Sequence, residues 1–191
     1  VTGTMPSRHA IVKNVTVTGN QESATKKESV ISLELSNFNK FSIAYSLAKA
    51  TGILTCRIRF NKLSVKDKES LHIALPFDAS NAEVLYKSGR EYITINKDQL
   101  PGSNKDFICT EGEIKLKSNN YSALIKSPHY NIFELNSMVD ETPVNGAKRW
   151  KNQTGDLSTL FLYVLNNYWH TNFKAWQDGE FDFTISLNIG E

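Results

Sequence analysis

The chain has 191 residues, an ordinary length for one domain of roughly 100 to 200 residues. Hydrophobic residues make up 40% and charged residues 22%, which favours a globular chain over a disordered or membrane-embedded one. The 22 basic and 20 acidic residues leave a net charge of +2, too small to attract nucleic acid or anionic lipid. We therefore expect neither nucleic acid nor a membrane among its partners.

Alternation of apolar and polar side chains with a period of two dominates the first 60 residues. Residues 10–17 and 30–35 alternate in this way, which predicts two half-exposed strands. Residues 21–29 are rich in charge and predict a solvated loop between them. Residues 41–47 and 54–60 flank a Gly-containing turn and predict a hairpin.

Short strands separated by turn residues continue along the chain. Residues 71–75 precede Pro76, whose missing N–H predicts the end of a central strand. Further strands are expected at residues 83–86, 92–95, 113–116, 121–125 and 131–135. A spacing of about 8 to 12 residues between strands is typical of a sandwich. The fold class expected is therefore all-β, an antiparallel β-sandwich that forms one domain over residues 1–191.

The last third of the chain contains one ambiguous segment. Residues 136–155 lack periodicity and predict a long loop, which is usually functional or mobile at such a length. Residues 157–165 are a continuous apolar run that fits a buried strand or two turns of helix, and we favour the strand. Residues 180–189 alternate over ten positions and predict a strand with one apolar face.

Few residues have the spacing that a catalytic or metal site requires. No pair among the four histidines has the spacing of a zinc site, so His72 is predicted to be an ordinary hydrogen-bonded histidine. Cys56 and Cys109 are predicted to be two buried small side chains rather than a disulfide, which leaves the compartment open. Glu180 and Asp182 resemble a solvated strand face more than the carboxylate pair of a glycosidase.

All three tryptophans fall within 27 residues near the C-terminus, among several asparagines. Aromatic rings stack on the apolar faces of sugars, while amides exchange hydrogen bonds with sugar hydroxyls, so this mixture suits a carbohydrate surface. Large aromatic side chains also pack in cores, and asparagine side chains also cap turns. Residue types alone therefore leave a carbohydrate surface and a packed core both open.

The order of these residues carries a resemblance to a known family. Residues 160–179, with Asn166-Asn167-Tyr168-Trp169-His170-Thr171-Asn172 at their centre, look like the Asn-Asn-Tyr-Trp-x-Thr-Asn signature of family 38 glycoside hydrolases, the α-mannosidases. In that family the signature lies in the C-terminal β-domain. Residues 52–60, 69–77 and 98–103 are similar to the same domain, more weakly, so the likeness covers roughly residues 40 to 189.

The resemblance implies a fragment of a larger enzyme. Members of that family are retaining exo-acting α-mannosidases, with a zinc ion and an aspartate nucleophile in an N-terminal α/β barrel that nothing in this chain matches. Their C-terminal region is a β-sandwich assembly similar to the mutarotase-like supersandwich. The resemblance therefore implies no cofactor in this chain, zinc in a missing catalytic domain, and that catalytic domain as the main partner. A periplasmic or extracellular location is favoured if the source is bacterial.

The motif predicts the candidate site. The candidate carbohydrate-binding or domain-interface residues are Asn166, Asn167, Tyr168, Trp169, Thr171, Asn172 and Trp176. A structural alternative makes the same residues a turn whose amides bond the backbone while the aromatic rings fill the sandwich. A free-standing carbohydrate-binding module that uses Trp150, Trp169 or Trp176 is the rival function, and a self-sufficient glycosidase is the third. An excised sandwich is also expected to leave edge strands open to homodimerisation.

Overall fold

The computed structural model of the chain describes residues 11–67, 69–79, 81–136, 153–155, 157–167 and 176–190. Within these ranges the chain forms thirteen strands and no helix, which confirms the all-β prediction. The strands are β1 (Val12–Glu22), β2 (Lys26–Leu35), β3 (Phe38–Ala48), β4 (Leu54–Lys62), β5 (Glu69–Ala79), β6 (Glu83–Ser88), β7 (Glu91–Thr94), β8 (Ile108–Cys109), β9 (Glu113–Lys117), β10 (Ser122–Lys126), β11 (Ile132–Leu135), β12 (Leu157–Asn167) and β13 (Gly179–Gly190).

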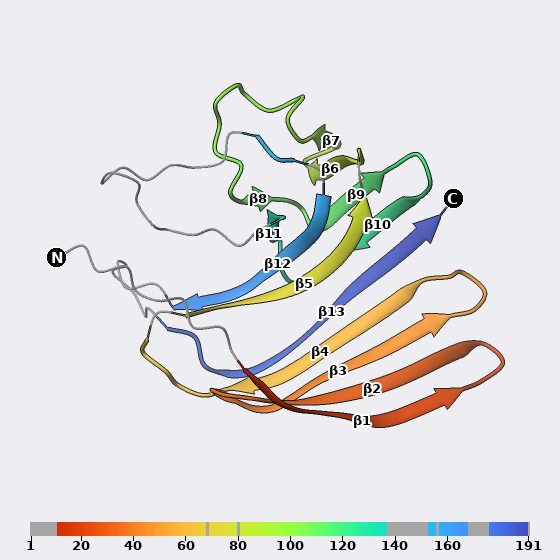
Figure 1. The fold of residues 1–191 in the computed structure, drawn as a ribbon, viewed down its shortest axis with the longest axis vertical. Helices are drawn as coiled ribbons and strands as arrows, with labels where there is room; N and C mark the ends of the chain where they lie inside the picture. The colour runs from red at the N-terminus through yellow and green to blue at the C-terminus, as the bar shows by residue number, and fades with distance from the viewer. Residues whose placement is uncertain are drawn as a thin grey trace.

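Two antiparallel sheets form the sandwich. The large sheet has nine strands in the order β1-β2-β3-β4-β13-β10-β9-β6-β7, and the small sheet has four in the order β5-β12-β11-β8. Figure 1 shows the small sheet lying over one part of the large sheet, while β1, β2 and β3 extend away from it. β13 lies between β4 and β10, so it joins the two halves of the large sheet.

Apolar side chains from the facing sides of the two sheets form the core. Along the middle of β4 and β13 every second side chain is buried, from Cys56 to Lys62 and from Phe183 to Leu187, as the alternation of residues 54–60 and 180–189 predicts, whereas Ile189 at the end of β13 is 57% exposed. Burying such a side chain contributes roughly 1.5–3 kcal/mol. Phe60 stacks between Phe41 and Phe181, with ring centroids 5.1 and 4.7 Å away, so β3, β4 and β13 are tied together at one end.

The loop predicted over the charged residues 21–29 is shorter in the structure. β1 continues to Glu22 and β2 begins at Lys26, so only a tight turn separates them. Ser23 Oγ accepts hydrogen bonds from the backbone N–H groups of Thr25 and Lys26 and so caps this turn. The charges lie on exposed strand ends, where water solvates them as well as it would in a loop.

Pro76 does not end its strand, and the prediction that it would was wrong. β5 continues to Ala79, with Pro76 opposite Thr159 of β12. Among the described strands β5 pairs with β12 alone, so it is an edge strand. Edge strands tolerate proline because one side of their ladder needs no N–H donor.

The other ambiguous predictions have mixed outcomes. Residues 157–165 are strand, as favoured, within β12. The loop predicted at 136–155 lies mostly outside the described residues. Both cysteines are free, and Cys56 is buried as predicted, with its pKa raised to about 11 by burial. Cys109 is exposed, contrary to prediction, because the two-residue β8 lies at the edge of the small sheet.

Candidate functional site

The structure describes three of the seven candidate residues. Asn166 and Asn167 are the last two residues of β12, and Trp176 lies just before β13. Tyr168, Trp169, Thr171 and Asn172 lie outside the described residues. The structure therefore shows the contacts of the two ends of the motif, at Asn166 and Asn167 and at Trp176.

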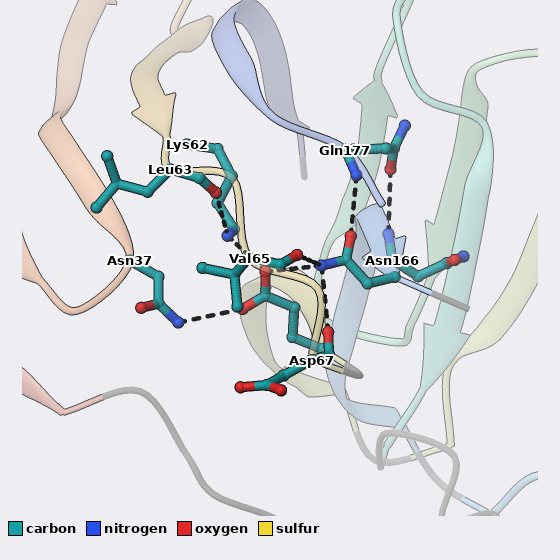
Figure 2. Close-up of polar contacts among 9 residues, drawn as sticks. Asn37, Lys62, Leu63, Val65, Asp67, Asn166 and Gln177 are labelled. Carbon is teal, nitrogen blue, oxygen red and sulfur yellow. Dashed lines mark hydrogen bonds and ion pairs between the residues drawn. The ribbon is translucent and has the colours of Figure 1, made fainter. Parts of the chain in front are cut away.

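Two amide side chains, those of Asn167 and Gln177, and two backbone N–H groups hold those ends together. The backbone N–H of Asn166 donates to Gln177 Oε1 at 3.2 Å, and the backbone N–H of Gln177 donates to Asn167 Oδ1 at 2.9 Å. We call Asn166, Asn167 and Gln177 the amide clasp. Figure 2 shows its two hydrogen bonds side by side. The clasp joins the end of β12 to the start of β13 across residues 168–175.

The side chain of Asn167 also fixes the segment between β4 and β5. Its Nδ2 group donates to Val65 O at 2.8 Å and to Glu69 Oε1 at 3.0 Å, and it lies 3.3 Å from Asp67 O. Only 1% of Asn167 is exposed, and such burial favours a fully hydrogen-bonded amide. Asn167 thus acts as an anchor within the protein. This fits the structural alternative, in which the amides of the motif bond the backbone.

A buried lysine lies next to this anchor. Lys62, at the end of β4, is 2% exposed, and its Nζ lies 2.5 Å from Glu69 Oε1 and donates to Leu63 O at 2.9 Å. Glu69 Oε2 accepts a hydrogen bond from Asn37 Nδ2 at 3.3 Å. We call Asn37, Lys62, Glu69 and Asn167 the buried polar node after its two buried side chains, Lys62 and Asn167; Glu69 is 21% exposed and Asn37 lies at the exposed rim. Figure 2 labels Asn37 and Lys62.

The charges in the buried polar node compensate each other. A buried cation is costly unless a partner of opposite charge and further hydrogen bonds satisfy it, and Glu69 and Leu63 supply both. The carboxylate of Glu69 in turn accepts from Lys62, Asn37 and Asn167. A carboxylate with three donors within the protein is suited to holding β4, β5 and β12 in register, rather than to proton transfer with a substrate.

Trp176 is the one candidate aromatic residue that the structure describes. Its ring is half-buried, and Lys66 Nζ lies 5.2 Å from the ring centroid, at cation–π distance. Lys66 belongs to the same segment between β4 and β5 that Asn167 anchors. The clasp, the node and Trp176 therefore form one continuous region around the end of β12.

Two other titratable groups that the sequence suggests, His72 and Asp182, have structural partners. As predicted, His72 is hydrogen-bonded: its Nε2 lies 2.7 Å from Glu134 Oε1, and its ring stacks on Tyr163 with centroids 4.6 Å apart. Asp182 lies on an exposed strand face, where Arg57 donates to both of its oxygens at 2.8 and 2.6 Å. That bidentate bond lowers the pKa of Asp182 to about 2, so Asp182 holds no proton to donate at neutral pH.

A shallow groove of about 250 Å³ lies on the outer face of the large sheet. Its lining is Glu111, Gly112, Glu113, Lys126, Pro128, Thr184 and Ser186. Tyr92 donates to Glu113 at 2.5 Å and Lys126 lies 3.0 Å away, and these two donors lower the pKa of Glu113. Two of the charged groups that line the groove, Glu113 and Lys126, are therefore bonded to each other.

Sequence reasoning missed Lys62 and Glu69, although a signal for Lys62 was present. Cys56, Ile58 and Phe60 occupy the inward positions of β4, and the same alternation extended by two residues turns Lys62 inward. An inward lysine predicts a buried carboxylate partner. No local pattern identifies Glu69 as that partner, because it belongs to the next strand.

The described residues contain no group of three His, Cys, Asp or Glu side chains arranged to hold a metal ion. In the same part of the chain no helix is both long enough and apolar enough to cross a membrane. No family model matches the chain, and no curated protein matches it.

Proposed function

We propose that this chain is the non-catalytic C-terminal β-sandwich portion of an α-mannosidase-like, family 38 glycoside hydrolase. In this role it packs on a separate catalytic domain that hydrolyses α-linked sugars, and it stabilises and shapes that domain. The observation that supports the proposal most directly is the amide clasp. The two asparagines that open the family-like motif form it with Gln177, so the rest of the motif begins and ends at a fixed point.

The clasp and the node divide the candidate residues between two roles. Asn167 is buried and bonded within the protein, so it positions the motif and does not contact a partner. Tyr168, Trp169, Thr171 and Asn172 follow it directly in sequence and remain the candidates for contact with the catalytic domain. Trp176 closes the motif beside Lys66 and belongs to the same candidate interface.

The proposal places all bond-breaking chemistry outside this chain. Zinc and the aspartate nucleophile would belong to the catalytic domain, and the isolated chain is expected to be inactive. Three of the described carboxylates are consistent with this, because Glu69, Glu134 and Asp182 are each bonded to a cationic or imidazole side chain. In this proposal the residues of this chain position the motif and pack on the catalytic domain.

The gene provides the first test. The reading frame upstream of residue 1 is expected to encode a larger domain with an α/β barrel and zinc-ligand residues, and a stop codon directly upstream would refute the proposal. In the full enzyme, Asn167→Ala is expected to lower hydrolysis of an aryl α-mannoside by about tenfold to a hundredfold, since even a mutation far from the chemistry that misplaces reacting groups by about 1 Å can cost about a hundredfold. Asn166→Ala is the matched control, because it keeps the backbone N–H that the clasp uses.

The rival function, a carbohydrate-binding module, rests on the half-buried Trp176. Titration of the isolated chain with mannose, α-mannobioses and other sugars, followed by tryptophan fluorescence and amide NMR shifts, separates the two functions. Saturable shifts that Trp176→Phe abolishes would establish the module. A folded chain that shows no shift across the panel is the result expected for a structural portion of a larger enzyme.

A further inference from the structure

Three side chains on the outer face of the small sheet lie in a row, in the order hydroxyl, imidazole, carboxylate. Ser70 Oγ lies 3.4 Å from His72 Nδ1, and His72 Nε2 lies 2.7 Å from Glu134 Oε1. Ser70 and His72 are two residues apart on β5, so they share one face of the sheet, and Glu134 reaches the ring from β11. The row therefore brings together groups from two strands that are far apart in sequence.

The exposure of these side chains falls along the row. Ser70 is exposed, whereas the side chains of His72 and Glu134 are 7% and 2% exposed. The imidazole stacks on the Tyr163 ring with centroids 4.6 Å apart, and the Phe161 ring lies edge-on to it at 6.4 Å. The imidazole is thus fixed in orientation and shielded from water, while the hydroxyl stays accessible to a solute.

The hydrogen bond to Glu134 determines which nitrogen of His72 is free. An ionised carboxylate only accepts, so the proton of the neutral imidazole lies on Nε2, and the lone pair of Nδ1 faces the Ser70 hydroxyl. A nucleophile, a base within reach of it and a third group that orients the base form the arrangement of covalent hydrolases. The distance of 3.4 Å is long, but such contacts are often longer in the absence of substrate.

We propose that Ser70 and His72 are the nucleophile and the general base of an esterase site, with Glu134 as the positioning residue. Ser70 Oγ attacks the carbonyl carbon of the ester, and its proton passes to His72 Nδ1. The tetrahedral oxyanion then collapses, and the leaving alcohol oxygen takes that proton from His72. Water next gives a proton to His72 Nδ1 and attacks the acyl-serine, which releases the acid and returns the proton to Ser70 Oγ.

Asn166 supplies a donor for the oxyanion. It lies directly opposite Ser70 in the β5–β12 ladder, and the Cβ atoms of such a pair are about 4.5–5.5 Å apart. Its backbone N–H belongs to the amide clasp, whereas its side-chain amide has no hydrogen-bond partner within the part of the chain that the structure describes. The amide is therefore available to a developing negative charge beside Ser70.

The position of Ser70 limits the substrate class. Because Ser70 is exposed on a sheet face, few side chains would contact a large acyl group, and we expect esters of short acyl groups such as acetate. This reaction is separate from glycoside hydrolysis, toward which the isolated chain is expected to be inactive. The inference is therefore independent of the proposed function and is tested on the chain alone.

Hydrolysis of 4-nitrophenyl acetate by the whole chain at pH 8 tests the proposal, with buffer and the heat-denatured chain as blanks. Sustained turnover above both blanks is expected, because surface lysines react with this ester only once each. Ser70→Ala should lower the turnover by at least about a hundredfold. Ser122→Ala is the matched control, because Ser122 is also an exposed strand serine, on β10, and it should leave the rate unchanged.

Two further variants test the groups around the nucleophile. Glu134→Gln should lower kcat by at least about tenfold with KM unchanged, because a group that orients the base acts on the transition state. A purely structural Glu134 would lower the thermal stability without this split. Asn166→Ala should lower kcat by about a hundredfold, as the loss of one oxyanion donor does. Circular dichroism and thermal unfolding show whether each variant is folded.

Labelling of the unmodified chain with a fluorophosphonate probe requires no variant. Peptide mass spectrometry should find the adduct on Ser70, formed with loss of fluoride. Sustained turnover that Ser70→Ala abolishes, together with this adduct, would establish the site. Absence of turnover above the blanks, a rate for Ser70→Ala equal to that of Ser122→Ala, or an adduct confined to other residues would each overturn the proposal.

Discussion

Replacing Asn167 by Ala tests whether the amide clasp and the buried polar node hold this end of the sandwich. The substitution removes the hydrogen bonds to Val65 O and Glu69 Oε1 and the one from the Gln177 N–H. A net hydrogen bond contributes about 1 kcal/mol, and a buried group left without its partner costs about 1–3 kcal/mol. Gln177 is exposed and regains water, so we expect a total loss of about 3 kcal/mol in the free energy of unfolding.

Urea unfolding followed by far-ultraviolet circular dichroism measures this loss. A slope of about 2 kcal/mol/M is reasonable for a domain of this size, so the midpoint should fall by about 1.5 M at unchanged slope. Asn166→Ala is the control, because the clasp uses only its backbone N–H, and it should change stability by less than about 0.5 kcal/mol. Equal midpoints for the two variants would refute the anchoring role of Asn167.

A second variant at the same position separates hydrogen bonding from volume. Asn167→Asp keeps the shape and the acceptor for Gln177 but turns a carboxylate oxygen toward Val65 O and Glu69 Oε1. Because both of those atoms are acceptors, we expect Asn167→Asp to destabilise the protein at least as much as Asn167→Ala. A tolerated Asp would show that the Nδ2 donor contributes little.

Three further outcomes follow from the buried and charged groups. Lys62→Met leaves Glu69 without its cation and should cost about 3 kcal/mol in urea unfolding, since breaking a buried pair costs about 3–5 kcal/mol, and a loss below about 1 kcal/mol would contradict the pairing. Carbon-detected NMR titration should place the pKa of Asp182 at about 2, and Arg57→Gln should raise it toward its usual value. Because the folded pKa is depressed, the stabilisation from Asp182 is complete above about pH 4 and is lost as the pH falls through about 2. A thiol reagent at pH 8 should modify only Cys109 in the native protein and both cysteines in urea, and rapid native labelling of Cys56 would contradict its burial.

The strands with strict alternation were predictable from sequence. Residues 180–189 became β13 and residues 54–60 became most of β4, because inward apolar and outward polar side chains leave little choice of face. The antiparallel sandwich followed from the spacing of such strands. Residues 21–29 were mispredicted because the charged hairpin between the edge strand β1 and its neighbour β2 has the same composition as a loop.

The site was less predictable than the fold. The amides of the motif indicated either a turn or a ligand surface, and only the burial of Asn167 identifies it as an anchor. Lys62 and Glu69 belong to different strands, and their pairing depends on how the segment between those strands folds back. Pro76 shows the same limit, since its effect depends on whether a strand is central or at an edge, which a single sequence does not specify.

The central place of β13 has a consequence for how the chain folds during synthesis. β13 lies between β4 and β10 and pairs with both of them. Its residues 179–190 leave the ribosome after all the other described strands. The meander β1–β4 can form early, because its contacts are local. The two halves of the large sheet must then wait, with their inner faces exposed, until the last strand inserts between them. Such long-range closure is slow compared with hairpin formation, so the large sheet is expected to close late and to depend on protection of its half-formed state from aggregation until β13 inserts.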